Sequence, residues 1–102
     1  MVELPHMSVT IPLTIKFMQE SQAKGCPIVA YNPEFDISSC GKNEEEAKQR
    51  LEEAIDILLN GAKEDGVFEE ILEEVGFTKK KTEYIAPKTS FSTFLYRFGS
   101  YA

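Results

Sequence analysis

Residues 28–61, IVAYNPEFDISSCGKNEEEAKQRLEEAIDILLNG, decide the fold of this 102-residue chain. The stretch runs from a short apolar segment through a proline-containing corner into an acidic helix start. Asn43 is suited to cap that helix, and Glu46 can reach back to the amide of the capping residue. Behind the cap, apolar residues recur at helical spacing and form one stripe that can cover a sheet: Ala47, Leu51, Ala54, Ile55, Leu58, Leu59 and Ala62.

The segment before this stretch alternates apolar and polar residues. Residues 8–18 have the period of a half-buried strand, with one side made of Val9, Ile11, Leu13, Ile15 and Phe17. Pro12 has no N–H for a ladder, so we expect an edge or a bulge there. Residues 27–32 and 35–38 predict two more short strands. Such short connections favour antiparallel pairing, because a parallel crossover needs about a dozen residues or more.

The second half of the chain predicts a short helix over residues 67–75 and then strands. Residues 82–86 alternate, and the segment SFSTFLYRFGSY at residues 90–101 is aromatic and β-prone. In that segment Phe94, Tyr96 and Phe98 fall on one face, with Phe91 and Leu95 on the other. We therefore expect a strand that is buried on both sides. The predicted fold class is α+β: an antiparallel sheet of order β-β-β-α-α-β, with room for one further strand, and helices on one face.

Composition sets outer limits on the function. The length predicts a single domain over residues 1–102, and 42% hydrophobic with 27% charged residues is typical of a globular chain. Without an apolar run long enough for a bilayer, or a secretion signal, we expect a cytoplasmic protein. Cys26 and Cys40 lack C-x-x-C spacing and His6 completes no common zinc pattern, so we expect two free, partly buried thiols, no metal and no cofactor.

Charge is distributed unevenly along the chain. Residues 43–76 hold twelve carboxylates and three basic side chains, a balance of −9, whereas the whole chain carries −6 and the remainder therefore +3. Such a layer repels phosphate backbones and steers a basic partner; the alternative is a solvated face that only keeps the chain soluble. The candidate partner-binding residues are carboxylates of the helix and of the corner before it: Glu34, Asp36, Glu52, Glu53 and Asp56.

Residues 28–61 resemble the core of HicB-like antitoxin domains. The resemblance covers about a third of the chain and is carried by Tyr31, Pro33, Glu34, Gly41, Glu45, Glu46, Ala47, Leu51, Glu53, Ala54 and Ile55. It implies a reduced ribonuclease H-like core and a non-catalytic role. HicB-like antitoxins occupy the active face of HicA, a small basic toxin that cleaves mRNA with a histidine. A solitary family member without a toxin is the other case that the resemblance allows.

The C-terminal tail departs from the family pattern. Many HicB antitoxins continue into a ribbon-helix-helix or helix-turn-helix segment that binds DNA. Here the tail is aromatic and strand-like, with no basic recognition helix, so DNA binding is not expected. We expect instead a homodimer or larger oligomer formed through sheet edges or through the aromatic C-terminal strand, where Phe94, Tyr96 and Phe98 would form the interface.

Three other functions can be read from individual residues. A metal-dependent nuclease needs several converging carboxylates, whereas only Glu34 and Asp36 lie near predicted strands. A thiol enzyme would use Cys40 at the helix start with His6 as its base. We expect neither activity. RNA binding is the alternative function that stays open, because aromatic residues beside cations can stack single strands; it would use Phe94, Tyr96, Phe98, Arg97 and the lysines at 79–81.

Overall fold

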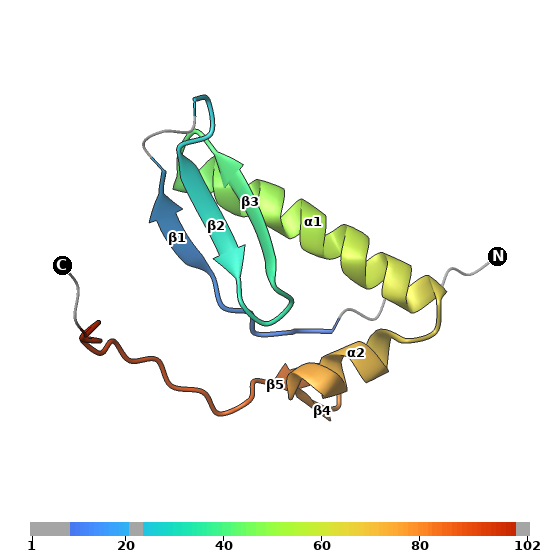
Figure 1. The fold of residues 1–102 in the computed structure, drawn as a ribbon. Coiled ribbons are helices and arrows are strands. Elements are labelled where there is room, and N and C mark those ends of the chain that lie inside the picture. Colours follow the sequence, from blue (N-terminus) through green and yellow to red (C-terminus); the bar gives the residue numbers. More distant parts are fainter. Residues whose placement is uncertain (1–8, 21–23, 100–102) are drawn as a thin grey trace.

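The computed structural model describes residues 9–20 and 24–99 of the chain. Three strands, two helices and a hairpin follow one another in this part (Figure 1). The elements are β1 (Lys16–Gln19), β2 (Ile28–Asn32), β3 (Ile37–Gly41), α1 (Glu44–Glu64), α2 (Phe68–Val75), β4 (Thr78–Lys80) and β5 (Glu83–Ile85). The predicted α+β class is confirmed, since an antiparallel sheet and two helices are present.

The main sheet has three antiparallel strands in the order β1-β2-β3, as the short connections predict. Lys16 lies opposite Tyr31, and Ile28 lies opposite Gly41. The first strand is shorter than the alternation over residues 8–18 predicts, and Ser8 lies outside the described residues. β1 begins at Lys16, on the far side of Pro12, while Thr10 forms an isolated parallel bridge with Glu83. The same apolar side nevertheless faces inward, because Leu13, Ile15 and Phe17 pack on the core.

The third strand was predicted at residues 35–38, and this was wrong by two residues. The chain turns at residues 33–36, where Asp36 has a φ of 55°, and β3 begins only at Ile37. Asp36 tolerates this left-handed backbone better than most residues. A buried polar network holds the corner. Asn32 is 0% exposed, and its Nδ2 donates to the Thr14 carbonyl and to Glu34 Oε1, both at 2.8 Å.

Helix α1 begins with the predicted cap. Asn43 Oδ1 accepts the Glu46 N–H at 2.8 Å, and Glu46 Oε1 accepts the Lys42 N–H at 3.2 Å, one residue earlier than the expected Asn43 amide. Both helices end at a glycine with positive φ, Gly66 at 75° and Gly76 at 106°. A residue without Cβ adopts this conformation at little cost, so the next amide can satisfy the helix's last carbonyls.

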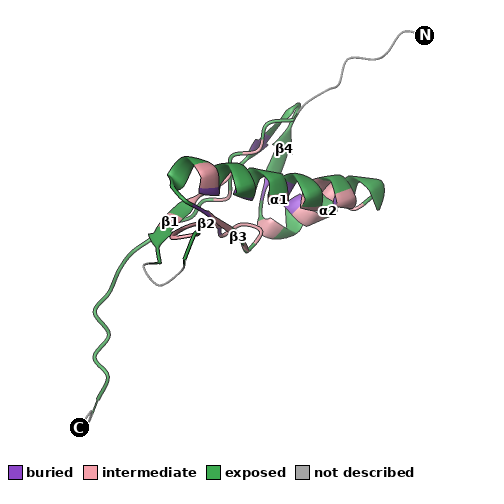
Figure 2. Cartoon of the chain, turned by 90° about the horizontal axis from the view of Figure 1, so that it is seen from above, coloured by how far each residue is buried: buried purple, intermediate pink, exposed green. Residues whose placement is uncertain are grey.

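The main core lies between α1 and one face of the sheet. Ala30, Ala47, Leu51 and Ile55 are its buried members, so the predicted helical stripe is confirmed. Figure 2 shows α1 lying across the strands, with its outer surface exposed. Gly41 permits this approach, because a Cβ at that position would lie 2.5 Å from the Ala47 nitrogen. α1 covers a single face of the sheet, so the opposite face, which carries Met18 and Tyr31, has no helix on it.

A second, smaller core joins α2 to the hairpin formed by β4 and β5. Its buried members are Leu72, Phe77 and Tyr84. Leu13 and Phe35 contact both cores and so connect the two parts of the molecule. α2 therefore covers the hairpin, which is a separate two-stranded sheet, and this corrects the expectation that both helices lie on one sheet.

The predicted aromatic strand at the C-terminus is wrong. Residues 86–99 contain no strand, and the last strand of the described chain is β5, inside the alternating segment at residues 82–86. The tail runs away from the body in both views (Figures 1 and 2). The expectation of burial on two sides fails because the tail joins neither sheet, and the inner faces of the sheet and the hairpin are already packed on α1 and α2.

Candidate functional site

The outer surface of α1 carries three of the predicted partner-binding carboxylates. Glu52, Glu53 and Asp56 are all exposed and lie away from the stripe that packs on the sheet. Two ion pairs brace this surface. Arg50 pairs with Glu46 at 3.3 Å, and Lys48 pairs with Glu52 at 4.0 Å. Since three of the four side chains are more than half exposed, these pairs orient the surface more than they stabilise the fold.

Ile57 lies beside these carboxylates and was missed in reading the sequence. It is 76% exposed, the largest such fraction for an apolar residue outside the tail. Successive positions four apart lie on one side of a helix, so Glu53 is its neighbour one turn earlier. The available signal was its position outside the apolar stripe. Together Glu52, Glu53, Asp56 and Ile57 form what we call the α1 outer patch, an apolar side chain bordered by negative charge.

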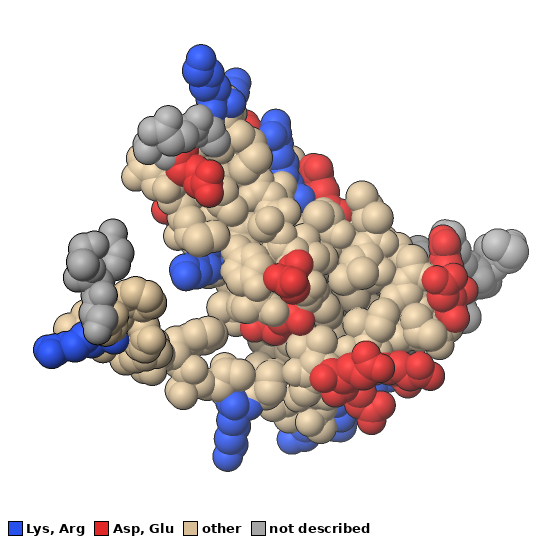
Figure 3. Space-filling model, in the orientation of Figure 1, with Lys and Arg blue, Asp and Glu red and all other residues tan. Residues whose placement is uncertain are grey.

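The acidic layer continues onto α2. Glu69, Glu70, Glu73 and Glu74 are exposed, and carboxylates gather over α2 and the adjoining end of α1 (Figure 3). Glu69 accepts a 3.0 Å hydrogen bond from Lys79 of β4, and this bond together with the charge of Glu69 raises the pKa of Lys79. Of the lysine run at residues 79–81, only Lys81 lies in the hairpin turn, with a φ of 59°.

Glu34 and Asp36, the other two candidate partner-binding residues, point to different places. Glu34 Oε1 accepts the Thr14 N–H at 2.6 Å and so ties the start of β1 to the corner. Asp36 is exposed and accepts the Tyr31 hydroxyl at 2.8 Å. That hydrogen bond, with desolvation and the Asp36 charge, raises the pKa of Tyr31. The two carboxylates therefore do not converge on one ion.

No metal centre is available in residues 9–20 and 24–99. No group of three His, Cys, Asp or Glu side chains there is arranged to hold a metal ion. His6, the base that a thiol enzyme would need, lies outside the described residues. The ionisable side chains in reach of each other instead form local pairs: Tyr31 with Asp36, Lys79 with Glu69 and Arg50 with Glu46.

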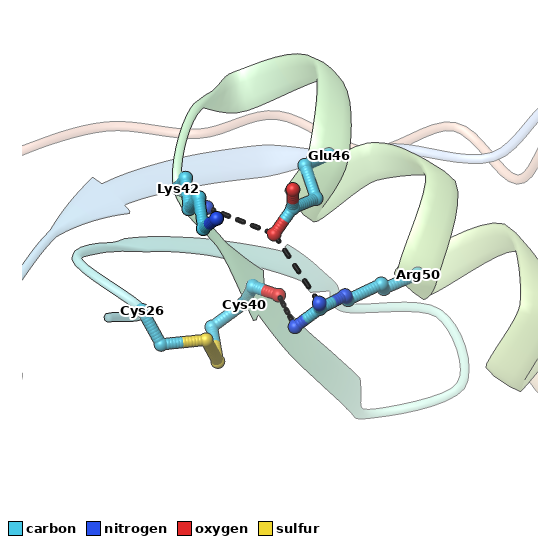
Figure 4. The surroundings of a disulfide bond; sticks show 5 residues. All are labelled: Cys26, Cys40, Lys42, Glu46 and Arg50. Carbon is cyan, nitrogen blue, oxygen red and sulfur yellow. Dashed lines mark hydrogen bonds and ion pairs between the residues drawn. A yellow bond between two sulfur atoms is a disulfide. The ribbon is translucent and has the colours of Figure 1, made fainter. Parts of the chain in front are cut away.

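The two cysteines form a disulfide, so the expectation of free thiols is wrong. Cys26, just before β2, bonds to Cys40 of β3, with their Cα atoms 5.4 Å apart (Figure 4). The folding of the β2–β3 hairpin brings the two together although they are separated by 14 positions. Next to the bond, Arg50 donates to the Cys40 carbonyl at 3.4 Å. Cys40 is therefore no nucleophile in this state, and the disulfide fixes the sheet end beside the start of α1.

The aromatic residues predicted to form an oligomer interface lie in the exposed tail. Phe94 is 78% exposed, Tyr96 75% and Phe98 68%. The first part of the tail borders the body, where a shallow hollow is lined by residues 14–16, Tyr31, Pro33 and residues 91–93. These aromatic side chains are consequently presented to solvent on an extended segment, and not on a sheet.

Comparisons with known proteins add no relative. No protein-family model, no curated protein and no solved structure matches the chain. Within the described part of the chain, neither helix has the length and apolarity that crossing a membrane requires. The function must therefore be argued from the surfaces themselves.

Proposed function

We propose that this chain is a non-catalytic interaction domain of the HicB-like antitoxin kind, with a reduced ribonuclease H-like core. Its partner is a small basic HicA-type mRNA-cleaving toxin; the alternative is a solitary family member without a toxin. The observation that carries the proposal is the α1 outer patch, in which Ile57 is 76% exposed beside the exposed carboxylates of Glu52, Glu53 and Asp56.

The patch has the two components that a protein interface needs. An apolar side chain at its centre gains free energy when a partner covers it, and a charged border sets orientation and encounter rate. A basic protein is the complementary partner, because the twelve carboxylates of residues 43–76 outnumber three basic side chains there. A surface that serves solubility alone has no use for an isoleucine at this exposed position, although single exposed apolar residues do occur in many proteins.

The α1 outer patch lies on a helix that is held firmly in place, which favours a binding role. α1 is anchored at its start by the Asn43 cap, and its inner side is fixed by Leu51 and Ile55 in the core. The disulfide between Cys26 and Cys40 holds the sheet beneath its first turns. Side chains on such an element lose little further freedom when they bind, which lowers the entropic cost of association.

Charge reversal tests the proposal directly. The probe is a HicA-type toxin whose catalytic histidine is replaced, and the measured quantity is its association rate at low and high salt. Glu52→Lys with Asp56→Lys should slow association at low salt by about tenfold or more, and the difference should shrink at high salt. The matched control is Glu20→Lys with Glu83→Lys, which changes the net charge equally but lies away from α1. Equal effects of both pairs would mean that the net charge of the chain, and not the α1 outer patch, sets the association rate.

Truncation of the apolar residue tests the contact itself. Ile57→Ala should speed dissociation of the toxin by about tenfold, as expected for a residue at the centre of an interface. Ile85→Ala is the control, because Ile85 is 50% exposed and lies on β5. Both variants should unfold at the same urea concentration as the wild type. An unchanged dissociation rate for Ile57→Ala would show that the α1 outer patch does not contact the toxin.

RNA binding by the tail is the second candidate function, and one observation favours it. Phe94 and Tyr96 are available for stacking, and Arg97 lies next to them in sequence. A single strand bound there would have to approach a chain whose net charge is −6. If the tail binds RNA, the wild type should bind a short fluorescent oligouridine and Phe94→Ser with Tyr96→Ser should not.

A further inference from the structure

The tail concentrates large apolar side chains with high exposure. Five of them within eight residues are exposed by 68 to 98%: Phe91, Phe94, Leu95, Tyr96 and Phe98. Residues 94–98 follow the shallow hollow that residues 91–93 line together with residues 14–16. Figure 2 shows this segment extended and exposed along its length.

The amount of surface matches what a dimer needs. An aromatic side chain buries about 150–250 Å² when it is covered, so the five side chains offer roughly 700 Å² per tail. A specific interface of standard size buries about 800 Å² on each partner. Two tails exchanged symmetrically between two copies reach this size with little help from other residues.

The charge of the tail identifies the kind of partner. Residues 86–99 carry Lys88 and Arg97 and no carboxylate, so the tail is +2 while the rest of the chain is −8. A basic toxin would be repelled by such a tail, whereas the acidic body of another copy of this chain attracts it. Charge complementarity therefore favours a second copy as the occupant.

The receiving surface is the outer edge of β1. β1 pairs with β2 alone in the described part of the chain. The Glu20 N–H donates to the Pro27 carbonyl at 2.6 Å, and backbone groups alternate along an antiparallel ladder. Lys16 and Met18 thus bond to β2, and Phe17 and Gln19 present their N–H and C=O groups outward. The other edge, at β3, is partly occupied because Arg50 donates to the Cys40 carbonyl.

We propose that residues 94–98 of one copy add as a strand to the outer edge of β1 in a second copy, and that the exchange is reciprocal. The tail is extended already and supplies alternating side chains, so Phe94 and Tyr96 fall on one face and Leu95 on the other. Met18, 38% exposed on β1, is the apolar residue of the edge that these side chains cover. The contact goes beyond the proposed toxin binding and uses a different surface.

Sedimentation of the full chain without any partner tests the exchange. The wild type should sediment at micromolar concentration with twice the 11.5 kDa mass of the chain. Gln19→Pro removes one outward N–H without touching the β1–β2 ladder, and it should raise the dimer dissociation constant by about tenfold or more. Gln19→Ala keeps that N–H and should remain a dimer. A wild type that stays monomeric overturns the proposal.

The tail variant gives a second, independent measurement. Phe94→Ser with Tyr96→Ser should raise the dimer dissociation constant by at least about a hundredfold and leave the urea midpoint of the monomer unchanged. Ile57→Ser, an equally exposed apolar site on α1, is the control and should remain a dimer. A tail variant that still dimerises overturns the proposal.

Two further outcomes would assign the tail elsewhere. If the tail variant is monomeric while a folded Gln19→Pro chain dimerises as tightly as Gln19→Ala, the tails pack on each other and the exchange with β1 is wrong. If the wild type is a monomer that binds a short fluorescent oligouridine, and the tail variant does not, the tail is an RNA-binding segment. Neither measurement contains a toxin, so failure here leaves the proposed function to its own test.

Discussion

Two segments of this chain are extended and rich in apolar residues, and only the first packs on a core. Ile11, Leu13, Ile15 and Phe17 occupy every second position before and within β1, and all four pack on a core. Residues 91–98 are richer in aromatic side chains, yet Phe94 remains 78% exposed. Apolar side chains on an extended segment provide surface that can be buried. Whether that surface is buried within the chain depends on another element to pack against, and the core-facing sides of α1 and α2 are already covered.

The largest difference between the two regions should appear when matched leucines are truncated. Leu51 is 2% exposed in the main core and Leu95 is 98% exposed in the tail. Leu51→Ala should lower the free energy of unfolding by about 2–5 kcal/mol, because it removes buried methyl groups and leaves a cavity. Leu95→Ala should change the stability of the monomer by less than about 0.5 kcal/mol. Urea unfolding of both variants at low concentration gives the comparison; similar losses would mean that the tail is part of the core.

The disulfide is the next largest contribution to the covered region. Replacing Cys26 and Cys40 by alanine should lower the free energy of unfolding by about 3 kcal/mol, because the closed loop restricts the unfolded chain. The tail should be unaffected, so dimer formation at native conditions persists. Disulfides are rare in the cytosol, so a thiol assay on the chain taken from cytoplasm bears on the localisation as well. Two reactive thiols in the folded protein would argue against the bond and in favour of the cytoplasmic prediction.

A pair of glycines sharpens the account of how α1 meets the sheet. Gly41→Ala should cost about 1–3 kcal/mol of stability, since the new Cβ meets the Ala47 nitrogen at 2.5 Å. Gly61 lies inside α1, and a Cβ added there would have no neighbour within 4 Å, so Gly61→Ala should stabilise the chain by about 0.5–1 kcal/mol. Thermal unfolding of the two variants should shift in opposite directions. Shifts of the same sign would contradict the close packing at Gly41.

The smallest expected effect is on Tyr31 at the uncovered face of the sheet. Its hydrogen bond to Asp36 raises the pKa of the phenol, and Asp36→Asn should lower that pKa toward the ordinary value. A raised pKa means that the bond stabilises the fold below pH about 10 and that this contribution is lost as the pH rises through the folded pKa. An NMR titration of labelled tyrosine rings reads the change. A pKa that does not move would show that Asp36 is not the cause.

Much of the covered region could be predicted from local residue patterns. The cap at Asn43 and the helical stripe are short-range features, and both are present in the structure. The strand boundaries could not be predicted so well. β1 is shortened because Thr10 bridges to Glu83, more than seventy positions away, and β3 starts late because Asp36 adopts a left-handed turn. Such effects depend on contacts that a local pattern does not contain.

The candidate sites were predictable to different degrees. Glu52, Glu53 and Asp56 were placed correctly on the exposed side, because helical periodicity fixes the outward positions. Ile57 was overlooked because a single apolar residue next to acidic residues matches no sequence motif. The network at Glu34 depends on Thr14 and Asn32, and the disulfide depends on the pairing of β2 with β3. Those contacts follow from the tertiary fold, which spacing alone does not reveal.

Taken together, we propose two separate binding surfaces on this chain, the α1 outer patch for a basic protein and the tail for a second copy. Native mass spectrometry of the chain with an inactive HicA-type toxin tests this proposal most directly. The wild type should give a complex of two chains and two toxins, and Phe94→Ser with Tyr96→Ser a complex of one each. The triple variant Glu52→Lys, Asp56→Lys and Ile57→Ala should give a dimer without bound toxin. Toxin binding that depends on the tail and survives the changes on α1 would contradict the account.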